Sequence, residues 1–236
     1  MTKTVLIFIH TDDRDPGYIA DFLTDRNIPY RIIRGGEGDV IPLLDGTVAG
    51  LVFMGGMMSA NDPIPWIEEE IKLIGQALAN NVPILGHCLG GQMISKALGE
   101  KVTENPVLEL GWHRCSPALN SSATHWLGNI DKTFTMFHWH SETFTVPAQG
   151  TLLFSSEHCH NQAYSVGDNV LAMQCHVEMT LPVMRSWMEE WRERLTNESP
   201  SVQSYRQIMQ HLEDNIAALN IVAEQLYRRW VSTLQL

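Results

Sequence analysis

Short apolar runs alternate with amphipathic segments through the first hundred residues of the chain. The expected strands are 4–10, 30–33, 51–54 and 82–85, and the expected helices are 18–26, 65–80 and 90–98. Strands that alternate with helices at this spacing are typical of βαβ units, which build a parallel sheet with helices on both faces. In such sheets the reactive groups gather at the carboxyl ends of the strands.

The pattern changes after Lys101, where shorter strand-like segments are joined by turns. These segments lie around 110–115, 133–138, 152–156, 162–166 and 170–174, and an amphipathic helix follows at about 181–195. Such spacing is typical of an antiparallel or mixed extension of a sheet. We therefore expect an α/β fold, a three-layer sandwich whose mostly parallel central sheet is flanked by helices.

The last forty residues carry an apolar stripe at alternating spacings of four and three. Its members are Tyr205, Met209, Leu212, Ile216, Leu219, Ala223, Leu226 and Trp230. A stripe of this kind either packs on the chain's own domain or forms the seam of a dimer. We expect one domain at 1–196 and a C-terminal helical extension at 197–236, with the choice between own-domain packing and a homodimer left open.

Composition narrows the class of partner and the compartment. The 236 residues are 44% hydrophobic and carry a net charge of −11, which argues against nucleic acid or an anionic membrane surface as a partner. The apolar run near the N-terminus is too short for a signal peptide or a membrane span. The four cysteines are scattered without close pairing, as in a reduced, cytoplasmic protein.

One cysteine stands on a glycine-rich turn. An apolar run ends at Gly86, Cys88 follows, and Gly90 and Gly91 open an amphipathic helix that ends at Gly99. A nucleophile held on a sharp strand-to-helix turn projects from the end of a sheet, and neighbouring glycines relieve the crowding. The helix N-terminus favours the thiolate over the thiol. We interpret Cys88 as a nucleophile, against the alternative of a small buried side chain in an ordinary turn.

A base and its orienting acid follow the strand at 170–174. His176 and Glu178 are two residues apart, so extended chain places both side chains on the same side. A nucleophilic thiol needs a base, and the base needs a third group to orient its ring. Together with Cys88 these residues form a candidate Cys–His–Glu triad.

Three segments in this order resemble the class I, triad-type glutamine amidotransferases. They are Gly55-Gly56 with Ser59 just beyond, Gly86-His87-Cys88-Leu89-Gly90-Gly91-Gln92, and Cys175-His176-Val177-Glu178. Trp139-His140-Ser141-Glu142 and Cys159-His160-Asn161-Gln162-Ala163 add a similarity to stand-alone proteins related to the amidotransferase domain of GMP synthetase. The resemblance covers about residues 3–195 and implies the flavodoxin-like glutaminase fold of that family.

The resemblance also implies a reaction and the residues that perform it. Cys88 would attack the side-chain amide of glutamine to give a γ-glutamyl thioester and ammonia, with His176 as the base and Glu178 orienting it. The backbone N–H groups of Leu89 and Gly56 would form the oxyanion hole. Water then hydrolyses the thioester unless an acceptor intercepts it, and no metal or organic cofactor is needed.

Substrate contacts and partners are implied in the same way. Gln92 and the segment Trp139, His140 and Ser141 would hold the glutamine end of the substrate. Nothing after residue 195 is typical of a synthetase, so any such acceptor enzyme would be a separate chain. Two other classes stay open: a γ-glutamyl peptidase with the same triad, and a non-catalytic relative that senses an amino acid or binds a partner.

Some positions differ from the family pattern or invite another chemistry. His87, Val177 and Glu142 stand where an aliphatic residue or Tyr, a Pro and an Asp are usual, so they bear on activity and on substrate recognition. The many histidines and cysteines invite a metal site, but their spacings match neither H-E-x-x-H nor C-x-x-C, and we expect no metal. We expect Trp187 and Trp191 to serve core packing.

Overall fold

A computed structural model describes residues 3–10, 15–130, 132–195 and 198–236. One nine-stranded sheet runs through the molecule in the order β2-β1-β3-β4-β9-β8-β7-β5-β6. The strands are β1 Thr4–Phe8, β2 Tyr30–Ile33, β3 Val48–Phe53, β4 Ile84–His87, β5 Val102–Pro117, β6 Phe134–Phe144, β7 Thr151–Ser156, β8 Ala163–Val166 and β9 Val170–Met173. The α-helices are α1 Tyr18–Asp25, α2 Pro65–Ala79, α3 Leu89–Ala97, α4 Ser121–Leu127, α5 Leu181–Trp191, α6 Tyr205–Met209 and α7 Leu212–Val231.

The sheet is parallel in one half and antiparallel in the other. Strands β2, β1, β3, β4 and β9 pair in parallel, and β9, β8, β7, β5 and β6 pair antiparallel. The α/β sandwich expected from the sequence is confirmed, with the antiparallel extension that the segments after Lys101 indicated. Strand β9 joins the two halves, and its register pairs Met173 with His87 of β4. The chain beyond β9 therefore emerges beside the chain beyond β4.

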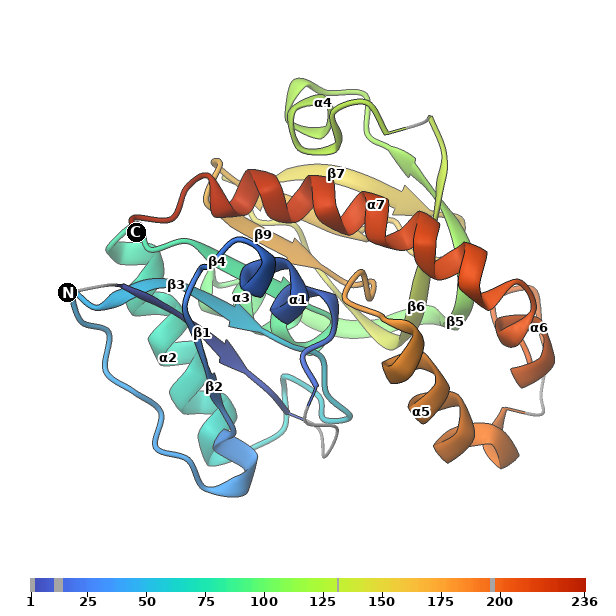
Figure 1. Cartoon of the computed structure of the whole chain (residues 1–236), viewed down its shortest axis with the longest axis horizontal. Coiled ribbons are helices and arrows are strands. Elements are labelled where there is room, and N and C mark those ends of the chain that lie inside the picture. Colours follow the sequence, from blue (N-terminus) through green and yellow to red (C-terminus); the bar gives the residue numbers. More distant parts are fainter. Residues whose placement is uncertain (1–2, 11–14, 131, 196–197) are drawn as a thin grey trace.

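Alternation along the strands divides the core between the two faces of the sheet. In β1, Val5 and Ile7 belong to one apolar cluster and Leu6 and Phe8 to another. The first cluster includes buried residues of α1, α4, α5 and α7, and the second includes those of α2 and α3. Because successive strand residues point to opposite faces, the same strands support both helical layers. Figure 1 shows α1 and α7 together over one face of the sheet.

The C-terminal stripe packs on the chain itself. The 20 residues of α7 include eight buried ones, among them Leu219 and Trp230, which are fully buried in the same cluster as residues of β1 and β9. The stripe is broken after α6, because His211 takes a positive φ of 55° and separates the two helices. One chain therefore buries most of this stripe without a second copy.

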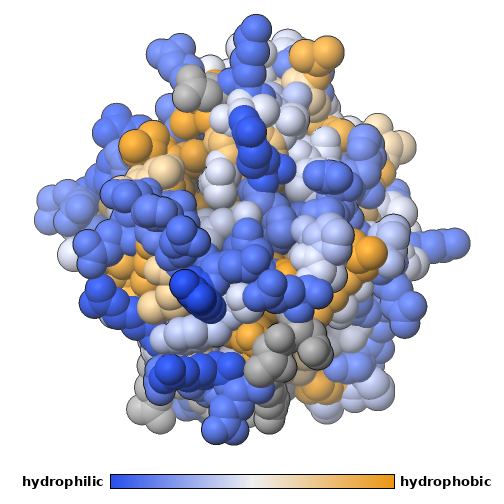
Figure 2. All heavy atoms as spheres, turned by 90° about the vertical axis from the view of Figure 1, so that its right-hand side faces the viewer, coloured by the Kyte–Doolittle hydropathy of each residue, from blue (hydrophilic) through white to orange (hydrophobic). Residues whose placement is uncertain are grey.

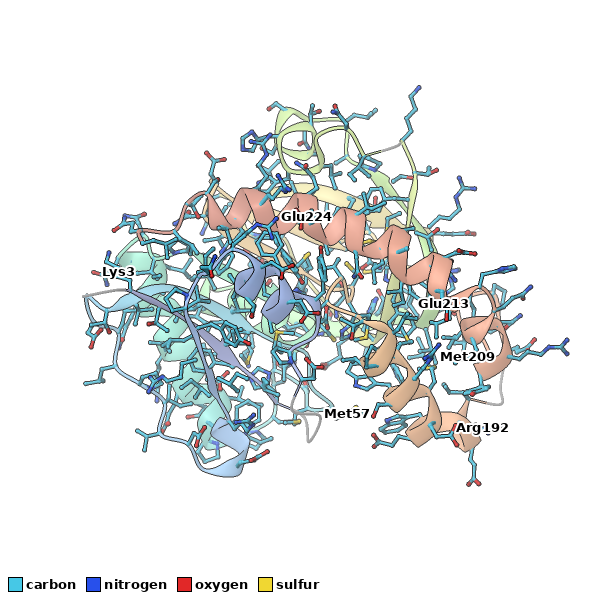
Figure 3. All side chains as sticks on the ribbon, in the orientation of Figure 1. Lys3, Met57, Arg192, Met209, Glu213 and Glu224 are labelled. Atoms are coloured by element: carbon cyan, nitrogen blue, oxygen red, sulfur yellow. The ribbon has the colours of Figure 1, made fainter. Side chains whose placement is uncertain are left out.

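Contacts with α1 support the placement of α7. Glu224 accepts hydrogen bonds from Tyr18 and Arg26 of the α1 region and lies over α1 in Figure 3. The face seen in Figure 2 has hydrophobic patches separated by hydrophilic residues. None of the described helices combines the length and the apolar character needed to cross a bilayer.

Two features of the antiparallel half were not expected. Helix α4 begins at an Asn120 cap, whose side chain accepts a hydrogen bond from the Ala123 N–H, and it packs against α7 and β7. Strand β5 runs for 16 residues, with a register shift against β6 between Glu104 and Glu109. The sequence indicated only the 110–115 portion of this strand, because the charged and proline-containing half before it lacks strand-like alternation.

Candidate functional site

Cys88 lies on a strained turn between β4 and α3. Its backbone has φ 49° and ψ −109°, a conformation that non-glycine residues rarely adopt. The turn is held by the Cys88 N–H, which donates to the Met173 carbonyl at 2.8 Å, and by the Gly90 N–H, which donates to the Met54 carbonyl at 3.2 Å. A β-carbon on Gly90 would lie 2.1 Å from the Phe53 carbonyl oxygen. Glycine is therefore required where α3 passes against β3.

His176 and Glu178 lie beside this turn, as the sequence indicated. His176 follows β9, and its backbone N–H donates to the Phe137 carbonyl at 2.9 Å. Its Nδ1 lies 2.6 Å from Oε1 of Glu178. The carboxylate therefore fixes which ring nitrogen carries the proton and leaves Nε2 free, while the Cys88 side chain lies close enough to raise the pKa of the ring. Cys88, His176 and Glu178 are 7%, 3% and 4% exposed.

The electrostatics of the buried pair favour a charged imidazole. Burial lowers the pKa of His176, but the Glu178 carboxylate and the neighbouring Cys88 side chain outweigh it and raise the pKa to about 10. Burial likewise raises the pKa of Glu178, while His176 and then His87 lower it, and the net direction is downward. An imidazolium held this way can stabilise a neighbouring thiolate and later protonate a leaving group.

Two glutamine side chains form a chain of hydrogen bonds that ends at the Cys88 thiol. Gln174, between β9 and His176, donates from Nε2 to Sγ of Cys88 at 3.5 Å. Its Oε1 accepts from Nε2 of Gln92 at 3.2 Å. Gln92 was expected to contact the substrate. In the structure it is hydrogen-bonded to Gln174, which in turn is hydrogen-bonded to the Cys88 thiol. Gln174 was missed, although its position directly before Cys175-His176 was the available signal.

The two candidate oxyanion donors come together from α3 and from the loop after β3. Leu89 is the first residue of α3, so its N–H has no acceptor within the helix. Gly56 faces it closely, because a β-carbon on Gly56 would lie 2.7 Å from Leu89 Cδ2 and 3.0 Å from His10 Cβ. His10 lies behind this loop in a buried pair with Glu70 at 2.8 Å, and its Nδ1 donates to the Met54 carbonyl at 3.0 Å.

A cleft of about 860 Å³ opens in front of Cys88. It is lined by Gly56, Met57, Ser59, Cys88, Gln92, Glu104, Leu108, Trp139, His140, Ser141, Glu142, His176, Trp187, Glu190 and Trp191, among others. All four residues expected to hold the substrate border it. Met57 lies between the parallel half of the sheet and α5 in Figure 3.

Trp187 and Trp191 have a second role beside the expected packing. They are half-buried against the core, yet both also line the cleft. Trp139 meets them edge-on, at ring separations of 6.0 Å and 5.5 Å, and Trp187 meets His176 at 5.5 Å. One wall of the cleft is therefore aromatic. The helical spacing of these residues was typical of core packing, and nothing local indicated that the helix borders a cavity.

Both ring nitrogens of His140 are bonded within the protein, so His140 supports the Trp139–Ser141 segment. Its Nδ1 lies 2.9 Å from the Glu142 carbonyl oxygen and its Nε2 lies 2.9 Å from Glu109 Oε2. Glu142 meets the loop after β3, where Ser59 Oγ donates to its Oε1 at 2.8 Å. Both ends of the Trp139–Ser141 segment are thus tied to neighbouring elements.

Glu109 also belongs to a group whose donor atoms lie within 4.8 Å of one another, close enough to hold a metal ion, together with His138 and His140. The Glu109 carboxylate accepts hydrogen bonds from Ser156 Oγ at 2.7 Å and from Gln162 Nε2 at 2.5 Å, besides its contact with His140. A carboxylate with this many protein donors fits a hydrogen-bond network better than a metal ligand set. Burial raises the pKa of Glu109, but His140, His138 and Ser156 lower it to about 2.

The arrangement of Cys88, His176, Glu178 and the cleft on an α/β sheet agrees with comparisons to known proteins. The family model for glutamine amidotransferase class-I matches residues 25–191. The chain belongs to this family.

Individual relatives give the same result. A glutamine amidotransferase from Methylobacillus flagellatus has a similar structure, with a TM-score of 0.95 and 39% identity over 100% of this chain and 96% of that one. The glutamine amidotransferase-like protein YfeJ of Salmonella typhimurium is 26% identical, over 80% of this chain and 81% of its own. A GMP synthase of Clostridium kluyveri is 32% identical, over 55% of this chain and 24% of that longer enzyme.

Proposed function

We propose that this protein is a glutaminase-type cysteine hydrolase that releases ammonia from the glutamine side chain. The observation that carries this proposal is the buried Cys88–His176–Glu178 arrangement, of which Cys88 and His176 line the cleft. Cys88 attacks the amide carbon, and the carbonyl oxygen becomes an oxyanion that faces the N–H groups of Leu89 and Gly56. His176 protonates the departing ammonia, and a γ-glutamyl thioester remains.

The second half-reaction releases glutamate or passes the acyl group on. Water attacks the thioester with His176 as general base, the oxyanion forms again, and the thiol is restored with release of glutamate. Gln92 and the Trp139–Ser141 segment border the path to the thiol and hold the glutamine end of the substrate. The similarity to part of a GMP synthase suggests that the ammonia can be passed to an acceptor enzyme.

A second candidate is the hydrolysis of larger γ-glutamyl compounds, which the size of the cleft favours. A volume of about 860 Å³ lies toward the upper end of the roughly 300–1,000 Å³ typical of small-molecule sites. The aromatic wall formed by Trp139, Trp187 and Trp191 offers an apolar surface beyond the reacting amide. The same three residues would cleave such a substrate, with an amine or a peptide as the leaving group.

Steady-state kinetics on matched substrates tests the proposal. Ammonia release from glutamine and cleavage of γ-glutamyl dipeptides are compared for the full chain, for Cys88→Ser and for Cys159→Ser, a control that alters another buried thiol. We expect turnover of glutamine that is lost in Cys88→Ser and kept in Cys159→Ser. Dipeptide cleavage with a much higher kcat/KM than for glutamine would favour the peptidase. Turnover that survives in Cys88→Ser would overturn both.

A further inference from the structure

The second carboxylate oxygen of Glu178 lies in a buried space away from His176. Oε1 bonds to His176, whereas Oε2 is buried without a hydrogen-bond partner among the described residues. His87 Nε2 lies 3.9 Å from Oε2, just outside hydrogen-bonding distance. A carboxylate can rotate, so its orientation toward His176 depends on what surrounds the free oxygen.

His87 is held in place by α7. Its Nε2 is hydrogen-bonded to the hydroxyl of Tyr227 at 2.9 Å, and the two rings meet edge-on at 5.9 Å. Both residues are fully buried. Tyr227 is itself fixed by an edge-on contact with Phe22 at 5.5 Å and by stacking with Tyr18 at 6.2 Å. The Tyr227 hydroxyl therefore keeps the His87 nitrogen from turning toward Glu178.

A second residue of α7 fixes the backbone next to Glu178. Nδ2 of Asn220 donates to the Met179 carbonyl at 3.0 Å. One residue earlier in the loop, the Glu178 carbonyl accepts a hydrogen bond from the Tyr18 N–H of α1 at 2.8 Å. Residues of both α1 and α7 therefore hold the backbone of the loop that carries Glu178. Helix α7 lies outside residues 25–191, the part of the chain that the family model matches.

We propose that Tyr227 and Asn220 are positioning residues through which α7 holds Glu178 in line with His176. The proposal rests on the proposed function, because it takes Glu178 as the acid that orients the base. Without the Tyr227 hydroxyl, His87 is free to bond to Oε2 and compete with His176 for the carboxylate. Without the Asn220 amide, the loop that carries Glu178 loses one of these two hydrogen bonds.

Charged and titratable groups face this unit from several elements. They are Cys88 and His87 at the end of β4, Cys175 and His176 after β9, Tyr18 on α1, Tyr227 on α7, and Asp15, which lines a small cavity with Glu178. Burial raises the pKa values of Cys175 and Tyr227 well above their usual range and lowers that of His87. When the reactivity of Cys88 is measured against pH, we therefore expect its alkaline limb to reflect the loss of the proton from His176.

The test compares two variants that each lose one buried hydroxyl. Tyr227→Phe removes the bond to His87, and Tyr164→Phe removes a bond of 2.8 Å to Ser95 Oγ in another part of the core. The rate of Cys88 alkylation by iodoacetamide is measured against pH, together with kcat and KM for glutamine. For Tyr227→Phe, we expect the alkaline limb of the alkylation rate profile to move to lower pH by about half a pH unit or more, because His176 loses support from Glu178. We expect kcat to fall about tenfold, with KM within about twofold.

The control decides between positioning and packing. Tyr164→Phe is expected to show a comparable change in thermal stability but an unchanged alkylation profile. Equal profiles for the two variants would overturn the proposal. Alkylation of Cys88 does not require turnover, so it tests the positioning role separately from the proposed substrate. A shifted alkylation profile in a protein that does not hydrolyse glutamine would support the positioning role and contradict the proposed substrate. If Tyr227→Phe does not fold, Asn220→Ala carries the test, with a smaller shift expected in the same direction.

Discussion

Short sequence motifs identify some residues of the candidate site and miss others. Cys88, His176 and Glu178 were predicted from the sequence, because a glycine-flanked thiol and a His-x-Glu pair each occupy a few consecutive positions. Gln174 and Tyr227 were not predicted. Their roles depend on the pairing of β4 with β9 and on the packing of α7, which no short segment contains. His87, which departs from the family pattern, is explained by a partner 140 residues away.

Glu109 allows a prediction about acid stability. Its pKa is lowered to about 2, so the ionised carboxylate stabilises the fold above the ordinary value of 4.5, and this contribution is lost as pH falls toward about 2. A shift of about 2.5 pH units corresponds to about 3 kcal/mol. We expect Glu109→Gln to be less stable than the wild type by about that amount at pH 7. The difference should shrink steadily between pH 4.5 and pH 2.

Denaturant unfolding at several pH values measures this difference directly. Glu104→Gln is the matched control, since Glu104 lies on the same strand and is exposed. A destabilisation by Glu109→Gln that stays constant down to pH 2, or an equal effect of Glu104→Gln, would contradict the ionised network described above.

Helices and strands with a strong hydrophobic periodicity were predicted, and those that depend on tertiary packing were missed. The strands of the parallel half were expected in the right places, with some ends two or three residues away from those observed, because each is a mainly apolar run bounded by turn residues. The break between α6 and α7 was not expected, since the apolar stripe continues through His211 with unchanged spacing. Helix α4 was missed because it is short, and its apolar residues are buried only by packing against α7 and β7.

Two glycines in helices offer a prediction about the nucleophile turn. A β-carbon on Gly90 would lie 2.1 Å from a carbonyl oxygen of β3, whereas one on Gly75 in α2 would have no neighbour within 4 Å. We expect Gly90→Ala to destabilise the fold by about 3 kcal/mol or more, because the backbone must shift to relieve the overlap. We expect Gly75→Ala to stabilise it by about 0.5–1 kcal/mol, since alanine favours the helix.

Thermal or denaturant unfolding of the two variants checks this pair. Both substitutions add one methyl group to a helical glycine, so propensity alone predicts stabilisation in both. Equal stabilisation by Gly90→Ala would show that α3 does not pass β3 as closely as described.

At the scale of the whole molecule, the sheet brings three distant segments to one edge. The loop after β3, the turn after β4 and the segment after β9 meet because these strands are neighbours and parallel. This meeting could be predicted from the sequence once the segments were placed on βα units. The aromatic wall of the cleft could not be predicted from the sequence, because α5 and β6 form it only through their packing on each other. Helix α7 then contacts the loop that carries Glu178.

The most direct test of the central claim is the intact mass of the protein after exposure to a glutamine analogue with a chloroketone in place of the amide. Burial raises the pKa of Cys159 to about 11 and those of Cys115 and Cys175 well above their usual range, so these thiols should not compete. We predict one adduct that excess glutamine prevents, that is absent in Cys88→Ser and that persists in Cys159→Ser. An adduct on another cysteine, or one on Cys88 that glutamine does not prevent, would contradict the account.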